Sequence, residues 1–133
     1  DEGSSQKMQV PAGTVPNLDE PLGIAIGQKD NYFMFKDLDL TGVKAVKGRF
    51  AVAAGIIQGG EVEFHLGSIE GEMIGKLVVE SGLTEFGLKE FQTNFSRSVE
   101  GKQDLYVVFK SEEKDEATMV GIADWFEFYN KPL

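Results

Sequence analysis

The feature that most constrains the fold is a strict alternation of residue types near the middle of the chain. Apolar residues alternate with charged ones and a histidine through the stretch VEFHL at 62–66. This period of two predicts a half-buried β-strand. A glycine-bearing polar loop follows, and the apolar run 73–79 predicts a second strand, so 59–82 has the pattern of a β-hairpin. A lone hairpin is at best marginally stable in water, so its apolar side requires a second layer from the rest of the chain.

Further strand-like segments flank this hairpin, and no segment shows a helical period. They are separated by turns rich in glycine and polar residues, a pattern typical of antiparallel sandwiches. The sequence therefore predicts an all-β fold, an antiparallel β-sandwich of the jelly-roll type, with at least seven strands and no helix longer than two turns. The expected strands are 7–10, 22–26, 32–40, 43–54, 90–95, 103–110 and 120–129, and the expected core is Val62, Phe64, Leu66, Leu77, Val79, Leu105, Val107, Phe109, Phe126 and Phe128.

Length and charge limit the function. A chain of 133 residues predicts a single domain. Its first residue is Asp1, so we expect a domain cut or processed from a longer protein, with 1–21 as an irregular N-terminal segment. The net charge of −9 disfavours nucleic acid as a partner, although a neutral ligand is not affected. The chain lacks cysteine, which excludes disulfides, and no apolar run is long enough to predict a membrane span.

Two titratable residues are candidates for chemistry. His65 is the only histidine and lies on the polar side of its strand, so we interpret it as a surface residue rather than a catalytic or zinc-binding one. Asp124 falls on the same side of the last strand as Phe126 and Phe128, where a carboxylate is costly unless it is paired or bound to metal. It either lies near the strand mouth and caps a loop, or binds a cation.

Four stretches together resemble family 6 carbohydrate-binding modules. They cover the chain from about Leu22 to Tyr129, in order and at fitting spacing. The hairpin VEFHLGS followed by GEMIGKLV, at 62–68 and 71–78, is similar to a hairpin of that family. The other three are NYFMFKDLDLTG at 31–42, GKQDLYVVFK at 101–110 and ADWFEF at 123–128.

The resemblance implies a jelly-roll sandwich that binds an oligo- or polysaccharide and accompanies a catalytic domain in the same parent protein. It also implies a secreted, periplasmic or cell-surface location. In the family, two aromatic residues sandwich a sugar ring at a loop-end cleft and an asparagine binds it. The corresponding positions here are Ile26, Leu88 and Ile122, which are aliphatic and match the flat face of a sugar poorly.

The resemblance nevertheless places the candidate sugar site at this loop end, between 28–31 and 83–90. Phe86 is either the stacking platform or a plug that folds inward, and the candidate polar contacts are Gln28, Lys29 and Asn31, beside Leu88. Many relatives also carry a structural calcium ion.

The resemblance places any calcium at Asp124, with backbone carbonyls and an N-terminal side chain completing the oxygen ligands. The glutamate pair that shares calcium in the family is absent, and Gln9, with Gln6, is the nearest substitute.

Three functions compete. The first is a non-catalytic carbohydrate-binding module that targets an associated enzyme to a glycan. The second is a structural or protein-docking sandwich that has lost sugar binding, which the three replaced positions favour. The third, a stand-alone glycosidase, is the weakest because no acid pair stands out among the 22 acidic residues.

Overall fold

The computed structural model describes residues 5–9, 25–52, 59–80, 87–114 and 118–133. These residues form nine β-strands and no helix, which confirms the predicted all-β class. The strands are β1 (Ser5–Gln9), β2 (Ala25–Gln28), β3 (Tyr32–Asp39), β4 (Ala45–Val52), β5 (Gly60–Leu66), β6 (Glu72–Val79), β7 (Gly87–Asn94), β8 (Lys102–Lys110) and β9 (Met119–Tyr129).

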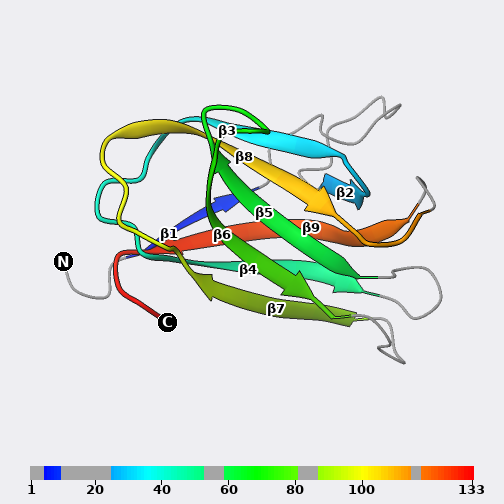
Figure 1. The fold of residues 1–133 in the computed structure, drawn as a ribbon. Helices are drawn as coiled ribbons and strands as arrows, with labels where there is room; N and C mark the ends of the chain where they lie inside the picture. Colours follow the sequence, from blue (N-terminus) through cyan, green and yellow to red (C-terminus); the bar gives the residue numbers. More distant parts are fainter. Residues whose placement is uncertain (1–4, 10–24, 53–58, 81–86, 115–117) are drawn as a thin grey trace.

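The strands form two antiparallel sheets packed as a sandwich (Figure 1). The first sheet has the order β1-β9-β4-β7, and β2 also pairs with β9. The second has the order β3-β8-β5-β6. Consecutive strands often lie in different sheets, for example β4 and β5, as expected for the jelly roll that the sequence predicts.

The apolar side of each strand fills the space between the sheets. The predicted core residues are at most 2% exposed, with the exception of Leu66. Leu66 ends β5 beside the hairpin loop and is only partly buried against the core. On β4, Val46 and Phe50 are fully buried, as the alternation predicts.

The alternation fails at Asp124 because β9 contains a bulge. Trp125 pairs with Arg49 of β4 and Ala123 pairs with Phe50, so Asp124 is an extra residue between two consecutive pairs. The prediction that Asp124 faces the core beside Phe126 is therefore wrong. Ala123 is fully buried instead, and Asp124 is only partly buried.

The two ends of the sandwich differ in what they carry. The β2–β3 turn and the end of β8 lie at one end, and the β5–β6 turn and the C-terminus lie at the other (Figure 1). No helix among the described residues is long and apolar enough to span a membrane.

Candidate functional site

At the loop end, Lys29 and Asn31, two of the residues predicted to contact a sugar, make hydrogen bonds within the protein. The Lys29 ammonium donates a hydrogen bond to the backbone oxygen of Glu113 at 2.6 Å, and the Lys29 amide donates to Thr118 O at 2.8 Å. The Asn31 carbonyl accepts from the Phe109 amide at 2.9 Å. These bonds fix the β2–β3 turn against the end of β8 and the start of β9. Phe86 lies outside the described residues.

Two predicted loop residues belong to strands. Gln28 is the last residue of β2 and pairs with Met119, and its side chain is outside the described part of the structure. Leu88 is the second residue of β7, with 48% of its side chain exposed. The prediction that both lie in loops is wrong, because each strand extends further toward this end than the sequence pattern indicates.

The three replaced family positions lie in one row across the first sheet. Ile26 of β2 pairs with Ile122 of β9. On the other side of β9, Ile122 pairs with Ala51 of β4, and Ala51 in turn pairs with Leu88 of β7. Three strand spacings of about 4.8 Å separate β2 from β7, so Ile26 and Leu88 are roughly 14 Å apart. Leu88 therefore lies far from the β2–β3 turn, although both are at the same end of the sandwich.

The expected metal position has a defined place in the fold. Asp124 lies in the β9 bulge, between Trp125, which pairs with Gln9 of β1, and Ala123, which pairs with Ala25 of β2. Asp124 is thus beside the point where β1 and β2 meet along one edge of β9. The side chain of Gln9 is outside the described residues, and no group of three acidic, His or Cys side chains that could hold a metal occurs among the residues described.

The outer face of the β3-β8-β5-β6 sheet carries an exposed aromatic platform. Among the described aromatic residues, Tyr32 is the one whose side chain is exposed, at 54%. Its ring lies 5.9 Å from that of Tyr106 on the neighbouring strand β8, tilted by 37°. Val108, directly opposite Tyr32 on the same face of the sheet, is buried. Together, the exposed Tyr32 and the partly buried Tyr106 form the tyrosine platform, a pair of adjacent aromatic rings on the outer face of this sheet.

Polar side chains continue this face across β5 and β6. Glu63 lies beyond Val108 in the same row as Tyr32, and His65 lies beside Tyr106. The His65 ring contacts the Glu63 carboxylate at 2.8 Å, and the two side chains are only 12% and 20% exposed. His65 is thus on the outer face as predicted, but is far more enclosed than an ordinary surface residue.

An ion pair borders the same face toward the loop end. Lys76 of β6 lies 2.8 Å from the Glu61 carboxylate. The hydrogen bond from Lys76 to Glu61, together with the opposite charge of that carboxylate, raises the pKa of Lys76. Both side chains are substantially exposed, so the pair contributes little to stability.

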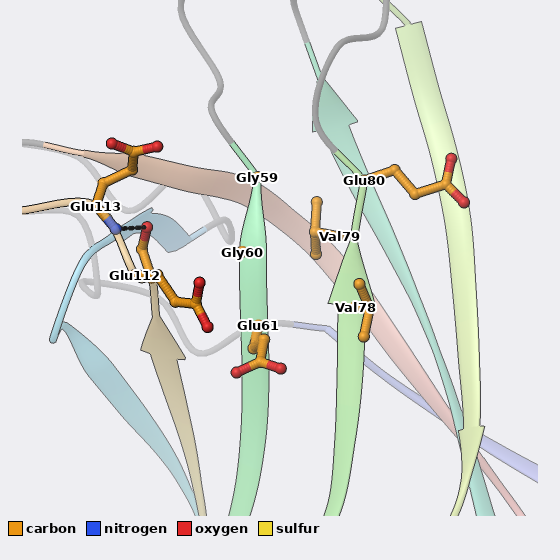
Figure 2. Close-up of a pocket in the computed structure, with 9 residues that line it drawn as sticks. Gly59, Gly60, Glu61, Val78, Val79, Glu80, Glu112 and Glu113 are labelled. Atoms are coloured by element: carbon orange, nitrogen blue, oxygen red, sulfur yellow. Dashed lines mark hydrogen bonds between the residues drawn. The ribbon is translucent and has the colours of Figure 1, made fainter.

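A hollow of about 540 Å³ lies at the loop end of β5, β6 and β8 (Figure 2). Of the described residues, Glu61, Val78, Glu80, Glu112 and Glu113 belong to its lining, which contains no aromatic residue from that part of the chain. Figure 2 shows Glu61 on β5, Glu112 after β8, and Glu80 at the end of β6 with its side chain extending away from Glu61. The hollow adjoins the sheet face through Glu61 and Val78, and its described lining offers carboxylate acceptors.

The tyrosine platform is not among the sites predicted from the sequence, because Tyr32 and Tyr106 lie within the expected strands 32–40 and 103–110. The sequence feature that could have identified this platform is an aromatic residue on the less apolar side of a strand, Tyr32 on β3 and Tyr106 on β8. Two such residues on paired strands place aromatic rings on the outer face of a sheet, where burial does not require them.

Comparisons with known proteins define the class. The family description for carbohydrate-binding modules of family 6 matches residues 9–130, so the chain belongs to this family. No curated protein sequence matches the chain.

Solved structures of the family share the fold. The chain is similar to a family 6 module from Clostridium cellulolyticum in complex with xylose, at 26% identity and a TM-score of 0.64, covering 76% of this chain and 73% of that one. A β-1,3-glucan binding module from Bacillus halodurans is 17% identical over 96% of this chain and 85% of that one, with a TM-score of 0.65. A family 43 arabinoxylan arabinofuranohydrolase from Bacillus subtilis, in complex with cellotetraose, is 20% identical at a TM-score of 0.65, covering 96% of this chain and 24% of that enzyme.

Proposed function

We propose that this carbohydrate-binding module is non-catalytic and holds an attached catalytic domain on a neutral polysaccharide outside the cell. The likeness to one part of the larger Bacillus subtilis glycoside hydrolase supports an accessory role, because the same fold occurs there within an enzyme. Family membership supports binding of a glycan.

The observation that carries the proposal is the exposure of Tyr32 next to Tyr106. A sugar ring presents a face of C–H groups that packs on a flat aromatic ring by dispersion. The two rings lie on paired strands with their centroids 5.9 Å apart and their planes tilted by 37°. The described loop end instead has aliphatic residues where relatives have stacking aromatics. We therefore propose that the glycan lies on the tyrosine platform.

Charge favours a neutral glycan over an acidic one. The chain has a net charge of −9, and the hollow beside the platform is lined by several glutamates. Such a surface repels a polyanion such as a uronic-acid polymer, whereas hydroxyl groups donate hydrogen bonds to carboxylates.

The loop end is the competing surface, with Phe86, Gln28, Lys29, Asn31 and Leu88 as its candidate contacts. Leu88→Ala is a matched control for Tyr32→Ala, because the two side chains are similarly exposed, on different sheets. Isothermal titration calorimetry with soluble xylo- and cello-oligosaccharides compares the two variants with the unmodified module.

We expect Tyr32→Ala to weaken binding roughly two- to tenfold, since one aromatic contact contributes about 0.5–1.5 kcal/mol beyond its buried area. Leu88→Ala should leave the affinity unchanged. The reverse pattern would move the site to the loop end. No heat of binding for the unmodified module at millimolar sugar would favour the structural or protein-docking function instead.

A further inference from the structure

Asp30, in the β2–β3 turn, has a left-handed backbone conformation with a φ of +68°. Among the described residues, one other non-glycine residue has a positive φ, Asp37 in the irregular part of β3. Aspartate tolerates this conformation better than most residues do, whereas a β-branched side chain is strained there. Such residues persist only where the surrounding structure fixes them, and they cluster at binding sites.

Asp30 is the first residue of a bulge that precedes the β3–β8 ladder. Its amide donates to Phe109 O at 2.8 Å, and the Phe109 amide donates to Asn31 O at 2.9 Å, so two residues face one. One common type of bulge has a left-handed first residue, which is usually glycine. The next residue, Tyr32, begins β3 in register with Val108. The conformation of Asp30 therefore determines how the chain enters β3 at the tyrosine platform.

The Tyr32 ring depends on this bulge because core packing does not hold it. Its side chain is 54% exposed, whereas Phe33, the next residue, is 4% exposed and belongs to the core. Core packing thus holds β3 from Phe33 onward, and the bulge holds the residue before it. With a residue 30 that cannot adopt a positive φ, the bonds to Phe109 would open and β3 would begin at Phe33. The Tyr32 ring would then lose its fixed position 5.9 Å from the Tyr106 ring.

The Asp30 carboxylate has a smaller part than the backbone. It lies 3.3 Å from the Lys110 ammonium, and the two side chains are 49% and 44% exposed. An ion pair this exposed contributes little. Asparagine and glycine also adopt a positive φ readily, so either should replace Asp30 without moving the Tyr32 ring.

We propose that Asp30 is a positioning residue for glycan binding, because its left-handed backbone holds Tyr32 beside Tyr106. This role rests on the proposed function, which places the glycan on these two rings. Asp30 acts through Tyr32 and needs no contact with the sugar. A substitution that prevents a positive φ should therefore weaken binding as much as Tyr32→Ala does.

The position of the Tyr32 ring can be measured without any sugar. The chain has three tyrosines, so nuclear Overhauser effects between the rings of Tyr32 and Tyr106 can be assigned in NMR spectra. We expect these effects in the unmodified module, in Asp30→Asn and in Asp30→Gly, and their loss in Asp30→Val. Should Asp30→Val fail to fold, Asp30→Ala takes its place. Effects that persist in the substituted module, or that vanish in Asp30→Gly, would overturn the positioning role.

Asp37→Val is the matched control, because it places the same side chain at the other left-handed aspartate. Two pairs with β8, Met34 with Tyr106 and Phe35 with Leu105, separate Asp37 from Tyr32. The contact between the two tyrosine rings should therefore survive in this variant. Its loss would show that the contact responds to any strain in β3, which would overturn a specific role for Asp30.

Calorimetric titrations with soluble xylo- and cello-oligosaccharides test the consequence for binding. Asp30→Val should weaken binding roughly two- to tenfold, as Tyr32→Ala does, and Asp30→Gly should change the Kd by less than about twofold. In a Tyr32→Ala background, Asp30→Val should have no further effect, because it acts through that ring. A further loss there would overturn the positioning role alone. Absence of oligosaccharide binding to the unmodified module would overturn both this role and the proposed function, whatever the NMR spectra show.

Discussion

The ring of Phe126 meets the ring of Phe64 edge-on, with centroids 5.7 Å apart and planes at 88°. Phe126 belongs to β9 of one sheet and Phe64 to β5 of the other, so this contact joins the two layers. Phe126 also contacts Phe33, Phe35 and Phe50 at centroid distances of 5.7–6.1 Å. It is therefore a central residue of the core.

Phe126→Ala should lower the free energy of unfolding by about 3–5 kcal/mol, because it removes a fully buried ring and leaves a cavity between the sheets. Urea denaturation followed by circular dichroism measures the change. Leu88→Ala, at an exposed apolar side chain, is the control and should change stability by less than about 0.5 kcal/mol. A loss below about 1 kcal/mol for Phe126→Ala would contradict the central position of this ring.

Much of the fold follows from the alternation of apolar and polar residues along each strand. Alternation places Phe64, Phe126 and Phe128 in the core because successive side chains of a strand point to opposite faces. The same counting fails at Asp124, because a bulge adds a residue and shifts the alternation, and nothing local in the sequence marks the bulge. It also ends β2 before Gln28 and begins β7 after Leu88, since backbone pairing does not depend on apolar character.

The Glu72 carboxylate should titrate below the usual range for glutamate. Two Arg97 nitrogens, Nε and one terminal nitrogen, donate to its two oxygens at 2.8 and 2.6 Å. These hydrogen bonds, and then the positive charge, lower the pKa of Glu72 from its ordinary 4.5. The pKa of Glu72 in the folded protein lies below its pKa in the unfolded chain. The stabilisation from the Arg97 contact is therefore fully present above the unfolded pKa and is lost as the pH falls through the folded pKa.

An NMR titration of the side-chain carboxyl carbons measures this pKa directly. Arg97→Ala should return the Glu72 titration toward 4.5, and Arg97→Lys should give an intermediate value because lysine cannot donate through a fork. Identical titrations in all three proteins would show that the pair does not form in solution.

Calcium, if it binds, should raise the melting temperature through Asp124. A ligand that binds only the folded state stabilises it, and Asp124 lies where β1 and β2 meet along β9. We expect a higher melting temperature in calcium than in chelator, and no difference for Asp124→Asn. Equal melting temperatures for the unmodified module would argue against this site.

The sugar site is harder to predict than the fold. The resemblance identifies the loop end, but Ile26 and Leu88 lack the flat faces that stack on sugars, and Ile122 lacks the amide of the asparagine expected at its position. The tyrosine platform depends on a diagonal contact between Tyr32 and Tyr106, which requires the β3–β8 register.

The measurement that tests the central claim most directly is an amide chemical-shift titration of the ¹⁵N-labelled module with soluble xylo- and cello-oligosaccharides. We predict perturbations centred on Tyr32, Glu63 and Tyr106, on the outer face of the β3-β8-β5-β6 sheet, and their weakening in Tyr32→Ala. Perturbations confined to 28–31 and 83–90, or none at millimolar sugar, would contradict the proposal that this face binds the glycan.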